Sequence, residues 1–186
     1  MSSTVKSMVE ELIALGIERE GSPVLAQRSE EIDFDMDDVL AIRARLVRTM
    51  ESVLKIYDFT RGFGLAAPQI GISKRAFVFG EAPEHIEFVA NPKVVWASPV
   101  TIEGYEGCLC NWEWRGKVLR PKEIELEFYD GLGKLQARRF SGEMARLVCH
   151  EIDHLDGTIY TDKLIPGSSI ATEEYMQKKM TRSALR

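Results

Sequence analysis

Two histidines and a glutamate lie close together in the last third of the sequence, in the pentapeptide His150-Glu151-Ile152-Asp153-His154. On a helix, residues four positions apart lie about 5–6 Å from each other on one face, so both imidazoles can reach one metal ion. Such an ion lowers the pKa of its water from about 16 to about 7, and Glu151 can then transfer the proton. The spacing predicts a metal-dependent hydrolase.

A catalytic metal site also needs a third protein ligand and an open position for water. Metzincin proteases require a histidine six residues after His154, but Tyr160 stands there. A thermolysin-like protease uses a downstream glutamate, for which Glu173 and Glu174 are the candidates. The sequence has three histidines, and the third, His85, lies in a polar, strand-like stretch that is typical of the surface.

Cysteine thiolates are the other candidate ligands. Cys149 adjoins His150, so on a helix it points about 100° away from it and is expected to be a small core residue. Cys108 and Cys110 precede a predicted strand and could approach the helix from a sheet. In a strand these two side chains face the same side, so spacing alone does not choose between them.

The pentapeptide needs regular elements to hold it, and the sequence predicts both helices and strands. The predicted helices cover residues 5–13, 37–57, 141–157 and 173–185. The predicted strands cover residues 75–79, 86–90, 94–96, 117–119 and 123–129, with a turn at Asn91-Pro92. This order favours the α+β class, with short antiparallel or mixed sheets packed around a central helix that carries HExxH. Residues 1–186 are expected to form a single catalytic domain.

Composition narrows the function classes. The formal net charge of −5 argues against a nucleic-acid binder. No apolar run approaches the roughly 18–20 residues that span a bilayer, so no membrane association is expected. The N-terminal residues lack the features of a secretory signal, and three cysteines do not suggest a disulfide framework. We expect a reducing, cytoplasmic setting.

Three ordered segments resemble one known family. They are residues 62–69 (GFGLAAPQ), 106–109 (EGCL) and 150–157 (HEIDHLDG). In content, order and separation they are similar to the motifs of peptide deformylases, which remove the formyl group from the initiator methionine of new polypeptides.

The resemblance implies roles for individual residues. It selects Cys108 as the third ligand beside His150 and His154, with Fe(II) as the usual ion and Ni, Co or Zn as substitutes. Glu151 would transfer the proton. The Gln69 side-chain amide and the Leu109 backbone N–H would stabilise the oxyanion.

The substrate groove is expected to be apolar where it takes a methionine side chain. The predicted substrate-binding residues are Gly62, Phe63, Gly64, Glu106, Gly107, Arg115 and Leu147. After Leu109 the family usually has serine and a small apolar residue, whereas this chain has residues 110–114 (CNWEW). Trp112 and Trp114 either shape the groove or pack against the sheet.

The expected partners are N-formylated nascent peptides. The resemblance also suggests that the basic end of the C-terminal helix docks on the ribosome, although a solvated helix explains its cations equally well. The alternatives are an amidase for another N-formylated substrate, an endoprotease that uses Glu174, and a non-catalytic metal-binding module.

Overall fold

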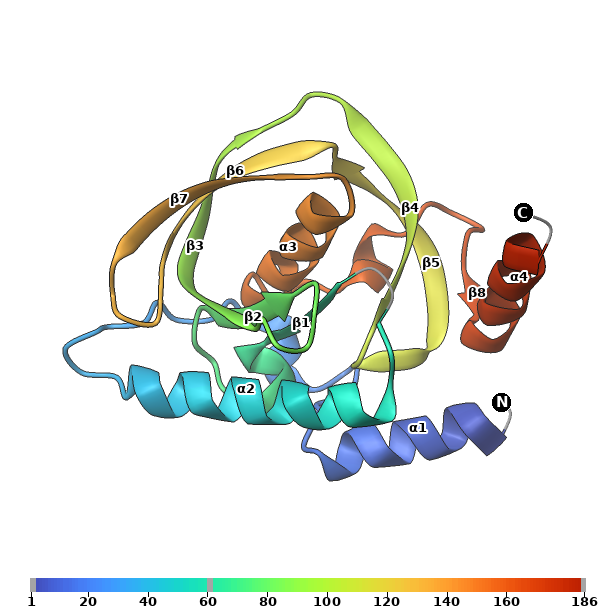
Figure 1. Cartoon of the computed structure of the whole chain (residues 1–186), viewed down its shortest axis with the longest axis horizontal. Coiled ribbons are helices and arrows are strands. Elements are labelled where there is room, and N and C mark those ends of the chain that lie inside the picture. Colours follow the sequence, from blue (N-terminus) through green and yellow to red (C-terminus); the bar gives the residue numbers. More distant parts are fainter. Residues whose placement is uncertain (1–2, 60–61, 185–186) are drawn as a thin grey trace.

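The computed structural model describes residues 3–59 and 62–184 of the chain. Two sheets curve around helix α3, and the other α-helices lie outside them (Figure 1). The α-helices are α1 (Ser3–Ala14), α2 (Val39–Ile56), α3 (Gly142–Leu155) and α4 (Thr172–Ala184). The strands are β1 (Phe63–Ala66), β2 (Ala76–Gly80), β3 (Glu87–Ala97), β4 (Thr101–Cys108), β5 (Asn111–Pro121), β6 (Glu123–Tyr129), β7 (Leu135–Ser141) and β8 (Ile170–Ala171). Short 3-10 helices cover Pro23–Ala26, Ala67–Ile70 and Tyr160–Lys163.

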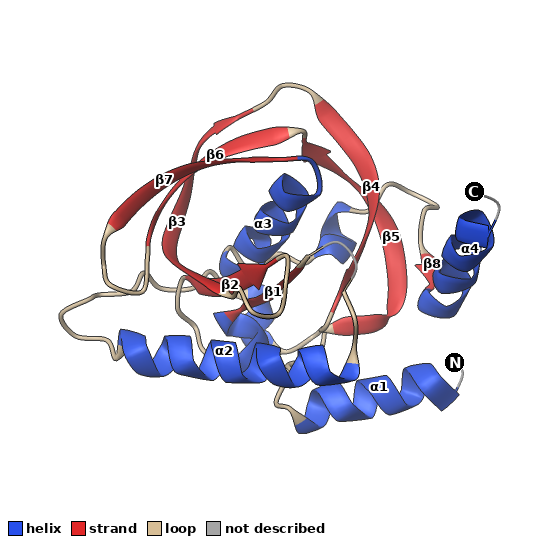
Figure 2. Cartoon of the chain, viewed as in Figure 1, coloured by secondary structure: helices blue, strands red, loops and turns tan. Residues whose placement is uncertain are grey.

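Both sheets are antiparallel, which confirms the predicted α+β class. The larger sheet has the strand order β1-β2-β3-β6-β7, and the smaller has the order β4-β5-β8 (Figure 2). β6 shows why the strands form: Ile124, Leu126 and Phe128 are buried, while the glutamates between them are partly exposed. This alternation is typical of a strand with one wet face.

The helices are placed by their apolar faces and caps. Leu46, Met50 and Val53 of α2 are fully buried, at the spacing of one helical face. The Asp38 side chain accepts a hydrogen bond from the backbone N–H of Ala41 at 2.9 Å, which satisfies a free donor at the start of the helix. The helical periodicity in this part of the sequence therefore predicted the element well.

Two predictions about the strands need correction. Asn91 and Pro92 do not form a turn between two strands, because β3 runs through them with register shifts against β6. Asn91 has φ 48°, a conformation that Asn tolerates, and its side chain pairs with the backbone of Ile32 in both directions. Residues 63–66, which are not among the strands predicted from the sequence, form β1 against β2.

α3 combines apolar and polar buried residues. Ala145, Val148 and Leu155 pack in the core that α3 shares with the larger sheet. On the same helix, polar side chains are buried as well: Arg146, His150, Glu151, Asp153 and His154. Buried polar groups require partners, so this face of α3 is where a site is expected.

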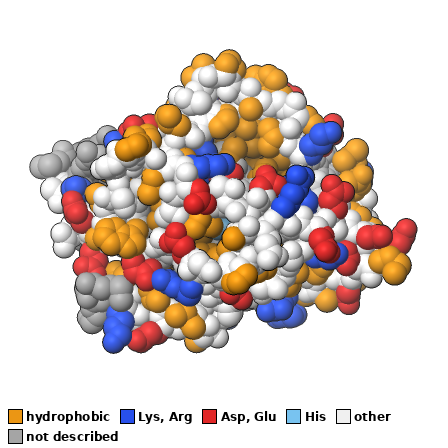
Figure 3. Space-filling model, turned by 180° about the vertical axis from the view of Figure 1, so that it is seen from behind, with side chains coloured by type: hydrophobic (Ala, Val, Ile, Leu, Met, Phe, Trp, Pro, Cys, Tyr) orange, Lys and Arg blue, Asp and Glu red, His pale blue; other side chains and the backbone are white. Residues whose placement is uncertain are grey.

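Figure 3 views the face opposite to that of Figure 1. Figure 3 shows hydrophobic side chains gathered around a hollow, with charged side chains at its border. Among the described residues, no helix is both long and apolar enough to cross a bilayer.

Candidate active site

The three predicted metal ligands meet at the buried end of a pocket. Cys108 ends β4, and His150 and His154 lie one turn apart on α3. The Cys108 Sγ lies 3.2 Å from the His154 Nε2. One ligand atom from each of the three residues lies within 4.8 Å of the other two, and all three side chains are buried.

This arrangement fits a divalent transition metal. Metal–ligand bonds of about 2.0–2.3 Å in a tetrahedron place the ligand atoms roughly 3.3–3.8 Å apart. The 3.2 Å between the Cys108 Sγ and the His154 Nε2 is close to this range. Burial raises the pKa of the Cys108 thiol to about 11, so a thiolate at neutral pH needs a cation beside it. Two imidazoles and one thiolate are suitable ligands for iron, cobalt, nickel or zinc.

The geometry also separates the alternative ligands. Within the described residues, the cluster includes Cys108 but neither Cys110 nor Cys149. Glu174 is exposed and forms an ion pair of 2.6 Å with Lys178, so it does not complete the cluster. His85 is exposed, as its sequence surroundings predicted.

Glu151 lies beside the predicted metal ligands with a free oxygen. Its side chain is 2% exposed, and its Oε2 has no hydrogen-bond partner in the part of the chain that the structure describes. Burial raises the pKa of its carboxyl to about 7. Gly64 packs against it so closely that a Cβ there would lie 2.5 Å from the Glu151 Oε1. Gly64 therefore makes room for the glutamate, and its predicted contact with substrate stays a prediction.

The two predicted oxyanion donors border the same space. Gln69 is held by a hydrogen bond of 2.7 Å from the Ala66 N–H to its Oε1. Its Nε2 then points to the sulfurs of Cys108, at 3.3 Å, and Cys110, at 3.5 Å. Thiols are weak acceptors, so these contacts can be exchanged for a stronger one. Leu109 follows Cys108 directly and is buried in the pocket wall.

A buried ionic network orients His150. Glu106 accepts two hydrogen bonds of 2.8 Å from Arg120 and one of 2.9 Å from Arg146. Its Oε2 also lies 3.0 Å from the His150 Nδ1, which leaves Nε2 for a metal. Burial opposes ionisation, but hydrogen bonds from Arg120 and His150 hold the pKa of Glu106 well below its usual range. Arg120 further bonds Asp153 at 2.6 Å.

A cavity of about 190 Å³ opens from the predicted metal ligands Cys108 and His150. It is smaller than the roughly 300–1,000 Å³ of pockets for drug-sized ligands, which suits the terminal residue of a chain. The predicted substrate-binding residues all line it: Gly62, Phe63, Gly64, Glu106, Gly107, Arg115 and Leu147. The carboxylate of Glu106 is already engaged by its partners, so its contact with substrate stays a prediction.

Several lining residues were not predicted from the sequence. They are Tyr57, Phe59, Tyr105, Glu143, Arg146, Tyr175, Met176 and Lys179. Arg146 stands one helical turn before His150, and this spacing could have indicated it. Nothing in the sequence indicated Tyr57 and Phe59, which follow α2, or the residues from α4, because they reach the pocket through tertiary packing.

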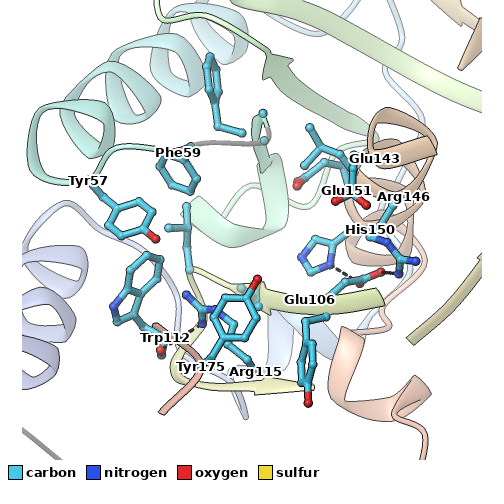
Figure 4. A pocket seen from close by; sticks show the side chains of 18 of the residues that line it. Tyr57, Phe59, Glu106, Trp112, Arg115, Glu143, Arg146, His150, Glu151 and Tyr175 are labelled. Atoms are coloured by element: carbon cyan, nitrogen blue, oxygen red, sulfur yellow. Dashed lines mark hydrogen bonds and ion pairs between the residues drawn. The ribbon is translucent and has the colours of Figure 1, made fainter. Parts of the chain in front are cut away.

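The two tryptophans in the unusual segment after Leu109 differ in burial. Trp112 is buried, lines the pocket and lies beneath the guanidinium of Arg115, whose Cζ is 4.6 Å from the ring centre. Trp114 is 49% exposed. Only the first tryptophan therefore shapes the pocket. Figure 4 shows Trp112, Arg115 and Tyr57 on one side of the pocket and His150 on the other.

Comparison with known proteins gives a consistent result. Residues 14–169 match the model of a family described as polypeptide deformylase. The chain is similar to peptide deformylase 2 of Nostoc sp. PCC 7120, with 32% identity over 88% of this chain and 93% of that protein.

Solved structures agree with this match. The crystal structure of peptide deformylase from Thermotoga maritima is similar, with a TM-score of 0.70, 31% identity and coverage of 81% of this chain and 97% of the other. A probable peptide deformylase from the Synechococcus phage S-SSM7 has a TM-score of 0.70 and 37% identity, covering 80% of this chain and 98% of the other. The chain belongs to the polypeptide deformylase family of hydrolases.

Proposed function

We propose that this chain hydrolyses the N-formyl group from the N-terminal formylmethionine of newly made polypeptides and releases formate. The observation that carries the proposal is the buried group of Cys108, His150 and His154 with Glu151 beside it at the end of a small cavity. The family supports the reaction, and its relatives named above give no support to an amidase for another formylated substrate.

In the proposed site, Cys108, His150 and His154 hold the metal ion. When bound, the ion supplies Lewis acidity, which polarises the formyl carbonyl and acidifies water. Fe(II) is the proposed ion, and Ni, Co or Zn would act as substitutes. Glu106 keeps the His150 ring in orientation through its hydrogen bond to Nδ1.

Glu151 is the proposed proton-transfer group. It accepts a proton from the attacking water and delivers it to the amine nitrogen as the C–N bond breaks. The raised pKa of its carboxyl suits both steps, because the group then accepts and releases a proton near neutral pH.

Gln69 and Leu109 are the proposed oxyanion donors. As negative charge develops on the formyl oxygen, the Gln69 Nε2 leaves its weak contact with the Cys108 sulfur and donates a hydrogen bond to this oxygen. The Leu109 N–H donates a second hydrogen bond to the same oxygen. Loss of one such donor is worth roughly 2.7–4 kcal/mol in the transition state. Leu147, Phe63 and Gly62 are proposed to contact the first side chain of the substrate.

The proposed partners are N-formylated nascent peptides. Docking of the C-terminal helix on the ribosome remains a prediction. A cytoplasmic location is also proposed, supported by the three free cysteines, Cys108, Cys110 and Cys149, which need a reducing setting.

The test is turnover of formyl-Met-Ala by protein purified anaerobically, with metal analysis of the same sample. Glu151→Gln is expected to keep the metal and to lower kcat by at least about 100-fold, because the proton-transfer group is lost. Glu174→Gln, an exposed change on α4, is the matched control and should leave kcat unaltered. Unchanged hydrolysis by Glu151→Gln would contradict the role assigned here.

A further inference from the structure

Helix α4 lies beyond residue 169, where the match to the family model ends, and it nevertheless forms part of the pocket. Three of its side chains line the cavity: Tyr175, Met176 and Lys179. These positions fall on one face of the helix, since residues four apart are neighbours on its surface. This wall of the pocket is therefore a feature of this chain that the shared family match does not cover.

The start of α4 is fixed to the strand that carries Trp112 and Arg115. Strand β8, directly before the helix, pairs antiparallel with β5, with Arg115 opposite Ile170. The hydroxyl of Thr172, the first residue of α4, is buried and donates a hydrogen bond of 2.5 Å to the Trp112 carbonyl. The helix consequently presents its side chains to the pocket from a defined position.

Tyr175 takes part in an aromatic border of the cavity. Its ring centre lies 5.2 Å from that of Tyr105 on β4, at an interplanar angle of 52°. Nearby, the rings of Tyr57 and Trp112 meet edge to face at 4.6 Å. In Figure 4 the labelled Tyr175 lies beside Arg115 and Trp112, away from Glu151 and Glu143.

The two ends of the pocket differ in the burial of their side chains. The side chains of Cys108, His154 and Glu151 are at most 4% exposed, whereas Tyr175 and Tyr57 are half-buried. The formyl group has to reach the buried end, so the peptide that follows the first residue passes the half-buried aromatic end. A rigid aromatic surface favours an apolar or aromatic side chain there.

We propose that Tyr175 is a specificity-determining residue, which contacts the second residue of the formylated peptide and favours apolar, above all aromatic, side chains at that position. The inference rests on the proposed function. Tyr105 supports the Tyr175 ring, and α4 thus sets which peptides are processed fastest without touching the reacting atoms.

The experiment compares kcat/KM for formyl-Met-Phe-Ser and formyl-Met-Ala-Ser, measured by formate release. The natural chain is expected to favour the Phe peptide by roughly 3–10-fold, the range of an aromatic contact. Tyr175→Ala should bring the ratio close to one through KM, whereas Tyr175→Phe should preserve it. Gln177→Ala, an exposed change on the same helix, is the matched control and should leave the ratio as it is.

The outcomes separate the two proposals. A natural chain without preference, or a Tyr175→Ala variant that keeps the preference, would overturn the role of Tyr175 while the proposed function stands. Failure of the metal-loaded natural chain to turn over either peptide would overturn the proposed function and this inference with it. Alanine has the highest helix propensity, so α4 should persist in Tyr175→Ala, which circular dichroism verifies. Tyr175→Leu keeps apolar volume without the ring. The ratio of kcat/KM for the Phe and Ala peptides in this variant therefore tests the contribution of the ring itself.

Discussion

At the scale of single residues, the site depends on close approaches that leave no room for change. Gly64 is the clearest example, because the Glu151 carboxylate occupies the space where any other residue would place its Cβ. The sequence motif placed Gly64 among the predicted substrate-binding residues. It could not show which neighbour requires it, because the neighbour lies on α3, far along the chain.

Gly64→Ala is expected to displace the Glu151 carboxylate and to lower kcat by about 100-fold, because small misplacements of a catalytic group have effects of this size. The measurement is turnover of formyl-Met-Ala, with circular dichroism to verify the fold. Gly131→Ala is the control, since a Cβ there meets only the flexible side chain of Arg43, at 3.1 Å. Equal activity of the two variants would show that Glu151 adjusts freely.

Glu106 provides a second prediction at this scale. Glu106→Gln is expected to weaken metal binding by about 10–100-fold, because His150 loses the partner that orients it. It also leaves buried arginine charge without a partner, so the free energy of unfolding should fall by about 3–5 kcal/mol. Metal affinity is measured by competition with a chelator, and stability by urea unfolding.

The matched control is Glu103→Gln on the same strand. Glu103 pairs with Lys117 and is 47% exposed, so the change should alter stability by only about 0–1 kcal/mol. Unaltered metal affinity in Glu106→Gln would mean that the His150 ring is held by packing alone.

At the scale of elements, hydrophobic periodicity predicted the long helices and β6, because each has one face in the core. It failed where local signals and tertiary structure disagree. Asn91-Pro92 is typical of a turn, but β3 continues through it because pairing with β6 resumes after the irregularity. β1 is only four residues long and is specified by its pairing with β2.

Asn91 gives the prediction that belongs to this scale. Asn91→Ala should lower the free energy of unfolding by about 2–4 kcal/mol, from a left-handed backbone and two lost hydrogen bonds to Ile32. Asn91→Gly loses the same hydrogen bonds but adopts positive φ without steric cost, so it should be destabilised less. Urea unfolding measures both. Equal losses in the two variants would show that the backbone conformation contributes nothing.

At the scale of the whole molecule, the proposed metal ligands join elements that are distant in sequence. Cys108 ends a strand of the smaller sheet, while His150 and His154 belong to the helix that packs against the larger one. The three ordered motifs carry the family resemblance, and that resemblance predicted that Cys108 lies beside the two histidines. Spacing alone left Cys108 and Cys110 equivalent, and only the turn after β4 separates them.

Removal of the ion should therefore lower the stability of the entire chain. A ligand at about 1,000 times its Kd contributes about 4 kcal/mol, which corresponds to a change in Tm of roughly 8–16 °C for a chain of this size. Scanning calorimetry before and after chelation measures it. Cys108→Ala lacks a ligand and should show little difference between the two samples; a full shift in this variant would place the ion elsewhere.

The buried network around Glu106 also has an evolutionary consequence. Glu106 pairs with Arg120 and Arg146, and Asp153 pairs with Arg120 and, at the edge of the network, with Lys163. A change of any one of the four buried side chains therefore alters the charge balance of the interior. Single substitutions in this set pass through unstable intermediates, whereas joint replacement by apolar residues need not. We expect these four positions to change together among descendants of this chain. The residues of solvent-exposed ion pairs are expected to be substituted one at a time.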